Sequence, residues 1–268
     1  MRAIAKVLVA LLVAGCIGSQ GGDSVPRGSP SVTGNGYELS TLNDPSKPTP
    51  APDKDIEVTG VSVLAVDNFD ETKDGKSDGN IYVEDLVDPK AQDNLAAGYH
   101  GVTVFAPSFN PPALRVAPGD VVDIRGRYQE FAGPTGFPFP TGQVLPELVG
   151  GTISLRFEYT SPAPVTVDVK DLADYKTGRK WIGMLVKVEN VKLFSDAADP
   201  GSGRYSAQLN VGAGVPIGQL PTVTNALFDL GATQLPMTAG TVFKSIVGVV
   251  QYFQNFSIAP RSAQDLAP

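Results

Sequence analysis

The fold is decided by the segment PGDVVDIRGRYQEF, residues 118–131. Between Val121 and Phe131 its apolar and polar residues alternate, as they do in a β-strand with one buried face. Gly126 interrupts this run, and a glycine inside a long strand commonly marks a bulge or a sharp bend. The same spacing of Gly, Gln and Phe returns in GVVQYF, residues 248–253. We therefore expect two similar β units, each with a long strand that bends where a small barrel closes.

Short alternating apolar runs separated by Gly, Pro and Asp turns extend through the chain from Ile56 onward, without a sustained helical period. A short helical turn is expected at 171–175, between two series of strands. The first series is Ile56–Val66, Asn80–Leu86, Val102–Ala106, Val121–Phe131 and a strand within 151–159; the second is Trp181–Phe194, Tyr205–Val211, Val223–Leu230, Val242–Phe253 and Phe256–Ile258. This pattern predicts an all-β fold of two tandem small barrels, residues 55–165 and 166–268.

The N-terminal region has the features of an export signal. A basic start, residues 1–6, precedes an apolar run, Val7 to Ala14, that is too short to span a bilayer. The run ends in Val13-Ala14-Gly15-Cys16, which resembles the lipobox of bacterial lipoproteins. The resemblance implies a signal peptide over residues 1–15, diacylglyceryl on the Cys16 sulfur and a further acyl chain, such as palmitate, on the new N-terminus. An ordinary signal peptide followed by a chance cysteine is the alternative.

Residues 16–54 are predicted to be a lipidated, flexible and disordered tether. Gly, Ser, Pro, Asp and Thr dominate this stretch, so it contains too little apolar surface to fold alone. We expect the protein in the bacterial cell envelope, held to the membrane by its lipid anchor. Ile17 and Gly18 follow the cysteine where some bacteria use an aspartate for inner-membrane retention, which favours the outer membrane over the inner membrane.

Composition argues against an enzyme. Cys16 is the single cysteine, so once it is acylated no thiol remains for a disulfide, a metal site or a nucleophile. His100 is the single histidine, which argues against a histidine-rich metal site. The pattern Gly-x-Ser-x-Gly occurs at 75–79, within an Asp/Gly-rich turn, but a serine hydrolase also needs a histidine base, and His100 is the only histidine. A hydrolase that uses carboxylates alone is a less favoured alternative. We predict a non-enzymatic protein without a cofactor, unless a structural calcium ion is bound.

Several strands resemble the OB-fold modules of bacterial exported proteins. The resemblance is carried by the segments GNIYVED (79–85), GVTVF (101–105), PGDVVDIRG (118–126), GMLVKVENV (183–191) and FSIAPRSAQDL (256–266). Tandem modules of this kind occur beside secreted nuclease domains and in stand-alone lipoproteins. Because these motifs are structural, they imply the fold and leave the function open.

OB folds bind ligands on the outer face of their second and third strands. Strand alternation predicts that Tyr82, Glu84, Thr103 and Phe105 lie on this face, where aromatic rings could stack on bases or sugars. The favoured partner is an unidentified protein, glycan or small ligand. Single-stranded nucleic acid is the alternative, but the formal net charge of −7 opposes a phosphate backbone.

An acidic loop, residues 67–80, is a candidate calcium site. Asp70, Thr72, Asp74 and Asp78 fall at positions one, three, five and nine of a count like that of an EF-hand. The twelfth position is Ile81 in place of a bidentate Glu, and the loop contains two lysines. The alternative is an exposed turn between two strands, because Asp, Asn and Gly suit turn geometry.

Overall fold

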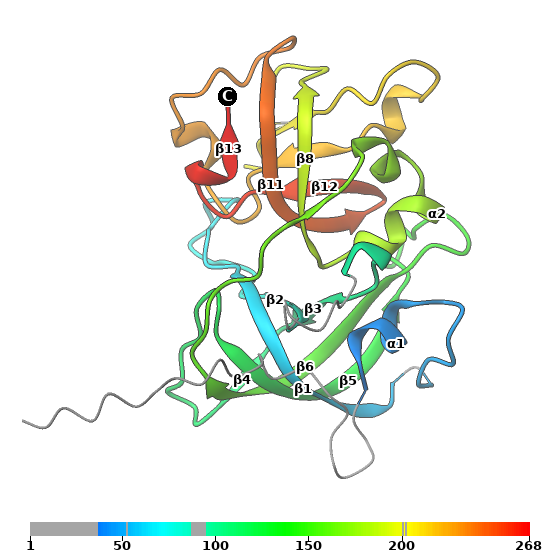
Figure 1. Cartoon of the computed structure of the whole chain (residues 1–268), viewed down its shortest axis with the longest axis vertical. Helices are drawn as coiled ribbons and strands as arrows, with labels where there is room; N and C mark the ends of the chain where they lie inside the picture. The colour runs from blue at the N-terminus through cyan, green and yellow to red at the C-terminus, as the bar shows by residue number, and fades with distance from the viewer. Residues whose placement is uncertain (1–36, 52, 87–94, 200, 202) are drawn as a thin grey trace, which may run out of the picture.

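The computed structural model describes residues 37–51, 53–86, 95–199, 201 and 203–268. Its strands form two sheets, one from each half of the chain, which lie one above the other in Figure 1. We call them the first sheet and the second sheet. The prediction of a mostly β fold is confirmed. The expected signal peptide, Cys16 and residues 17–36 lie outside the described residues.

The first sheet contains the strands β1 (Asp55–Val66), β2 (Ile81–Asp85), β3 (Gly101–Phe105), β4 (Ser108–Asn110), β5 (Val121–Phe131) and β6 (Leu145–Phe157). Their order is β3-β2-β1-β5-β6-β4. β3 also pairs in parallel with β6, where Thr103 faces Glu147. The pairings of β1, β2, β3, β5 and β6 therefore form a closed circuit.

The second sheet contains the strands β7 (Val165–Thr166), β8 (Leu185–Lys192), β9 (Ser206–Gln208), β10 (Thr222–Thr224), β11 (Val242–Phe253), β12 (Asn255–Ala259) and β13 (Leu266–Ala267). Their order is β7-β8-β11-β12-β10-β9, and β13 pairs with β11. An antiparallel bridge between Leu193 and Leu209, just beyond β8 and β9, closes this circuit as well.

The two circuits have the same strand order. β1, β2, β3, β5 and β6 correspond to β8, β9, β10, β11 and β12, including a parallel pair, β3–β6 or β10–β12. The repeated hexapeptides lie at the ends of the corresponding strands β5 and β11. A Cβ atom on Gly248 would be 2.6 Å from the Ala259 oxygen, and one on Gly126 would be 3.0 Å from the Gly151 Cα. Both glycines thus lie where the neighbouring strand approaches closely.

Helical segments of the described chain are short. They are α1 (Leu39–Asn43), α2 (Tyr175–Gly178) and the 3-10 turns η1 (Leu95–Ala97), η2 (Val169–Ala173), η3 (Arg179–Trp181), η4 (Ile217–Gln219), η5 (Leu230–Ala232) and η6 (Ala263–Asp265). The turns η2 and α2 overlap the helical turn expected at 171–175. Within the described ranges, no helix has the length and apolar character that a bilayer crossing requires.

The predicted tether ends earlier than residue 54. Leu39 and Leu42 of α1 are fully buried in the core of the first sheet. The Tyr128 hydroxyl donates a hydrogen bond of 3.1 Å to the Leu42 carbonyl oxygen, which fixes α1 against β5. Two apolar residues three positions apart share one face of a helix. Packing of that face stabilises a helix that is too short to be stable alone. Because the surrounding sequence is polar, the helix was not predicted.

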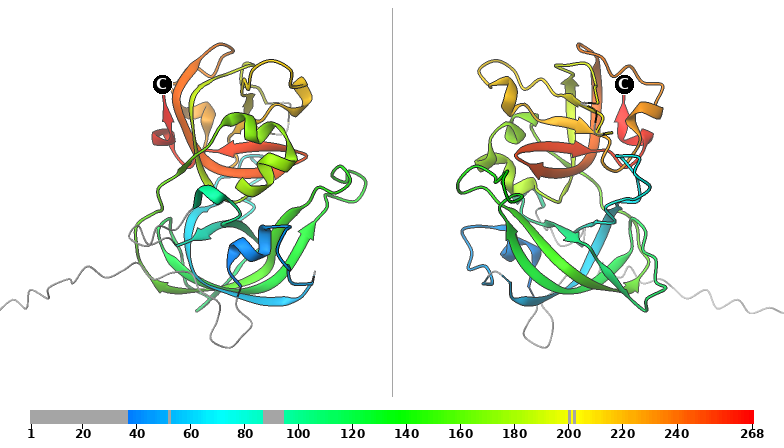
Figure 2. Two further views of the ribbon diagram at one scale, coloured as in Figure 1. Left: turned by 45° about the vertical axis from the view of Figure 1, so that its right-hand side comes forward. Right: turned by 180° about the vertical axis from the view of Figure 1, so that it is seen from behind.

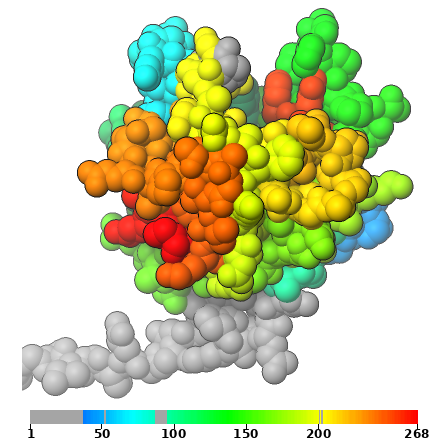
Figure 3. Space-filling model, turned by 90° about the horizontal axis from the view of Figure 1, so that it is seen from above, coloured from blue at the N-terminus to red at the C-terminus, as the bar shows by residue number. Residues whose placement is uncertain are grey.

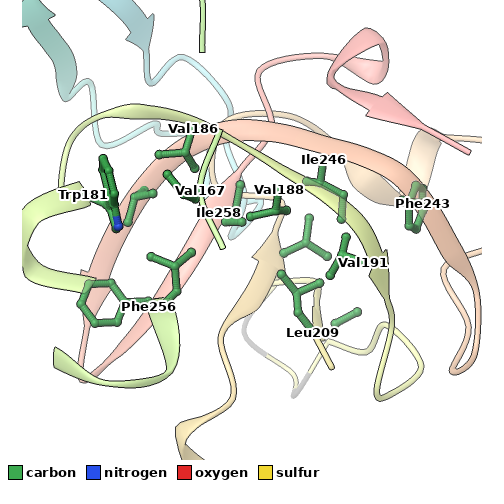
Figure 4. Close-up of a cluster of buried hydrophobic side chains, with 14 of the residues drawn as sticks. Val167, Trp181, Val186, Val188, Val191, Leu209, Phe243, Ile246, Phe256 and Ile258 are labelled. Atoms are coloured by element: carbon green, nitrogen blue, oxygen red, sulfur yellow. The ribbon is translucent and has the colours of Figure 1, made fainter. Parts of the chain in front are cut away.

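Each circuit encloses an apolar core. Along β5, Val122, Ile124 and Tyr128 are buried at intervals of two or four residues, as strand alternation requires. Figure 4 shows the corresponding core of the second sheet, in which side chains from β8, β11 and β12 converge. Its members include Val186, Val188, Val191, Phe243, Ile246, Phe256 and Ile258.

A third apolar cluster joins the two sheets. Tyr82 of β2 is buried in it, and so is Leu185 of β8. Beside it, the Leu185 backbone N–H donates a hydrogen bond of 2.9 Å to the Glu84 carboxyl group. The remaining members of the cluster are Leu64, Ala65, Leu227, Val249 and Ala259. Part of the outer face of the first sheet is therefore an interface with the second sheet.

Two glycines allow this contact. A Cβ atom on Gly101 would lie 2.3 Å from the carbonyl carbon of Gly183, and one on Gly183 would lie 2.6 Å from the Val102 nitrogen. Gly183 also has a φ of +77°, which L side chains rarely adopt. The backbones of β3 and of the segment before β8 thus meet without an intervening side chain.

Gly101→Ala is expected to lower the free energy of unfolding by about 1–3 kcal/mol, because the new methyl group overlaps the Gly183 backbone. Urea denaturation followed by circular dichroism measures this change. Gly218→Ala is the matched control, since a Cβ atom there meets nothing within 4 Å. A Gly101→Ala protein as stable as the control would contradict the close approach of the two sheets.

Candidate ligand-binding cleft

A cleft of about 690 Å³ lies between the two sheets and is lined by residues of both. On the first sheet it is formed by β2, β3, β5, β6 and the loop between β1 and β2; on the second it is formed by β9, β10, β11, β12 and Arg204. Figure 3 shows the molecule hollowed between the cyan and yellow loops on one side and the green β5–β6 hairpin on the other. We call this space the inter-sheet cleft.

One wall of the inter-sheet cleft is a row of side chains that crosses four strands of the first sheet. Tyr82 pairs with Thr103, Thr103 with Glu147, and Glu147 with Gln129. The adjacent residues on these strands, such as Leu148, are buried in the core. Because side chains alternate along a strand, the row must face away from the core, toward the second sheet.

The opposite wall is a row of amide and hydroxyl side chains. Gln251 of β11 pairs with Ser257 of β12, which pairs with Thr222 of β10. The next row, which includes Val250, is buried in the second core. The Gln251 amide donates a hydrogen bond of 2.6 Å to the Tyr82 hydroxyl. This bond joins the two rows at one end of the cleft.

Aromatic side chains also line the cleft. Phe105 and Phe253 lie on opposite walls and are 46% and 52% exposed, so both rings are accessible to a ligand. Phe139, in the hairpin between β5 and β6, packs edge-on against Tyr252 and Phe253 with centroid distances of 5.1 and 5.5 Å. In Figure 2 this green hairpin reaches up beside β12 of the second sheet. The hairpin therefore fixes the two walls relative to each other.

The loop between β1 and β2 gives the cleft an acidic end. Asp67, Glu71 and Asp78 line it together with Arg204, whose Nε lies 2.8 Å from Glu71 Oε1. Burial and the charges of Asp78 and Glu71 raise the pKa of Asp67 to about 7. The Oδ1 atom of Asp67 has no hydrogen-bond partner in the described structure.

Glu147 is the other notable carboxyl group of the cleft. It is 6% exposed, and burial alone raises its pKa to about 7. No charged group among the described residues contributes to this shift. The carboxyl group is therefore isolated within a wall that is otherwise uncharged.

The four residues predicted to bind a ligand all lie on the outer face of β2 and β3, but this face is not the open surface that we expected. Tyr82, Thr103 and Phe105 line the inter-sheet cleft. Glu84 is fully buried against the second sheet, where burial raises its pKa to about 8. Its role in the structure is to receive the Leu185 N–H.

The candidate calcium loop is held by its own side chains. Asp70 accepts hydrogen bonds from the backbone nitrogens of Asp74, at 3.1 Å, and Gly75, at 2.8 Å, as in a turn. Thr72 is exposed, and Asp78 lines the cleft. In the part of the chain that the structure describes, no group of three or more His, Cys, Asp or Glu residues is arranged to hold a metal ion. His100 pairs with Asp85 at 2.8 Å, away from the cleft.

Sequence reasoning missed Glu147. The expected strand began at 151, whereas β6 begins at Leu145. Pro146 and the pair Gly150-Gly151 resemble turn signals and concealed the start of the strand. With the correct start, alternation around the buried Leu148 would have indicated that Glu147 faces outward.

The fold and the cleft define a mostly β protein with two similar sheets and a polar, partly aromatic site between them. No family model, no curated protein and no solved structure matches this chain.

The buried carboxyl groups predict that stability falls as the pH rises. In the unfolded chain they lose their protons near pH 4, whereas in the folded protein Asp67 and Glu147 retain them to about pH 7 and Glu84 to about pH 8. The folded state thus binds more protons between these values, so the contribution of these three groups to stability is fully present below about pH 4 and is lost up to about pH 8.

Urea denaturation at pH 5 and pH 8 tests this expectation. Glu84→Gln, which keeps an acceptor for Leu185, should show a smaller decline than the wild type, and the exposed Glu158→Gln should match the wild type. Equal stability of the wild-type protein at the two pH values would refute it.

Proposed function

We propose that this protein is a non-enzymatic binding lipoprotein of the bacterial cell envelope and that the inter-sheet cleft is its ligand site. The observation that carries the proposal is the pair of facing rows, Tyr82-Thr103-Glu147-Gln129 and Gln251-Ser257-Thr222, on two sheets joined by a buried interface. A cleft with apolar rings and a few convergent polar groups is the usual form of a small-ligand site.

The strand order supports the finer assignment of each sheet as an OB-like barrel. Five strands close in a circuit in both halves, with a parallel pair at the same place in each. OB folds bind ligands on the face of their second and third strands. In both halves the equivalent strands, β2–β3 and β9–β10, contribute to the lining of the cleft. The two binding faces thus share one site.

The charges of the cleft favour a ligand other than nucleic acid. Its lining contains four carboxyl groups and one guanidinium group, which already pairs with Glu71. A phosphate backbone needs several free cations. A hydrolase that uses carboxylates alone is the less favoured alternative.

The anchor proposal rests on the lipobox-like sequence before Cys16 and the Gly/Ser/Pro-rich residues 17–36. Two or three acyl chains give stable attachment, whereas one short chain holds only marginally. Together they would hold the binding body near the membrane, with the outer membrane favoured.

Cys16→Ser is expected to move the protein from the membrane fraction to the soluble fraction after export, since it removes the acylated sulfur. Fractionation and intact-mass measurement of the wild type and this variant test the anchor, and Ser19→Ala is the control. Retention of Cys16→Ser in the membrane fraction would refute lipid anchoring at this residue.

Thr222→Trp should fill the inter-sheet cleft and weaken binding of any cleft ligand by roughly tenfold or more, because overpacking excludes the ligand from the site. Calorimetry on the acylated protein in detergent micelles, with a panel of neutral oligosaccharides, amines and oligothymidylate, provides the measurement. Thr160→Trp is the control at an exposed position outside the cleft. If Thr222→Trp left the binding of every ligand unchanged, or if the protein turned over a substrate, the proposal would be contradicted.

A further inference from the structure

The inter-sheet cleft contains more negative than positive charge. Asp67, Glu71, Asp78 and Glu147 line it, and in the described lining Arg204 is the sole cation. Arg204 is already paired with Glu71 at 2.8 Å. Three carboxyl groups therefore have no protein cation beside them in the cleft.

Two of these carboxyl groups are buried with fewer partners than buried carboxyl groups usually have. Asp67 is 5% exposed; the Phe69 backbone donates a hydrogen bond to its carboxyl group, but its Oδ1 atom has no partner, and the charges that act on it, on Asp78 and Glu71, are negative. Glu147 is 6% exposed, and no protein charge compensates it. Either group would be stabilised by a cation supplied from outside the chain.

The two negative positions are separated along the first wall. Asp67 acts electrostatically on Tyr82 of β2, so its charge lies near that strand. Glu147 is on β6, and β3 lies between β2 and β6. Two strand spacings amount to about 10 Å. A single compact cation cannot reach both positions, whereas a linear molecule with a cation at each end can.

The rest of the lining suits an alkylammonium ligand. An ammonium group has three donors, and the hydroxyl oxygens of Thr103, Thr222 and Ser257 accept hydrogen bonds. The exposed rings of Phe105 and Phe253 can pack against methylene groups and attract a cation over their faces. Acidic, hydroxyl and aromatic groups thus occur together in one cleft.

We propose that the ligand of the inter-sheet cleft is a linear diamine or polyamine, with one ammonium group at Glu147 and another at the acidic end formed by Asp67 and Asp78. This inference rests on the proposed function, because it names the chemical class that the same cleft binds. Its methylene chain lies along the Tyr82-Thr103-Glu147 row.

Calorimetric titration with spermidine tests the proposal on the acylated, full-length protein in detergent micelles. Glu147→Gln and Asp78→Asn should each weaken spermidine binding by roughly tenfold to a hundredfold, because each removes a charge-assisted hydrogen bond. Both substitutions preserve side-chain volume, and Asp78 is exposed, so folding should be retained and is checked by thermal unfolding. Glu158→Gln, an exposed carboxyl group outside the cleft, should bind as the wild type does.

The amine itself provides a second control. Butylamine, with one ammonium group, should bind at least roughly tenfold more weakly than spermidine, since it can occupy one negative position only. Spermidine binding that is equal in the wild type, Glu147→Gln and Asp78→Asn would overturn the inference.

The remaining outcomes separate this inference from the proposed function. If spermidine does not bind but a neutral oligosaccharide binds and is lost in Thr222→Trp, the cleft is the ligand site and the amine inference is wrong. Binding of oligothymidylate in the cleft would likewise overturn it. If no member of the panel binds, or if spermidine binding survives Thr222→Trp unchanged, the proposed function and the amine inference both fail.

Discussion

The contact between the outer face of β2–β3 and the start of β8 is the constraint on which the cleft depends. The Leu185 N–H reaches the buried Glu84 carboxyl group at 2.9 Å, and the Gly101 and Gly183 backbones meet beside it. Tyr82 and Leu185 are buried in one apolar cluster, and the removal of this apolar surface from water stabilises the contact. Without this contact the two polar rows would be separate, shallow surfaces. With it they form opposite walls of a single cleft.

The same contact brings carboxyl groups out of water. Glu84, Asp67 and Glu147 all have pKa values raised by burial, so the protein tolerates an electrostatic cost at and near the cleft. Glu84 is compensated in part by a backbone donor. Asp67 also receives a backbone hydrogen bond, from Phe69, but its Oδ1 atom has no partner, and Glu147 has no compensating group. This is the arrangement expected where a site retains groups for a ligand at some expense of stability.

Much of the fold could be predicted from the sequence, because strand alternation is local. β5 and β11 have the bounds that their patterns indicated, and the repeated hexapeptides occupy corresponding strands. Alternation also gave the correct face for Tyr82 and Thr103. It could not reveal that a second sheet covers that face, since docking depends on surfaces far apart in the chain. The start of β6 could not be predicted because the residues around Glu147 resemble turn residues. Helix α1 could not be predicted because two apolar residues are too short a pattern to indicate a helix.

Amide hydrogen exchange at Leu185, followed by nuclear magnetic resonance, tests most directly the claim that the two sheets are docked to form one cleft. The Leu185 N–H has its hydrogen-bond partner in the other sheet. We expect it to exchange as slowly as amides in the two cores, which open only on global unfolding. Exchange as fast as that of exposed loop amides would contradict the account, because the interface and the cleft would then not persist in solution.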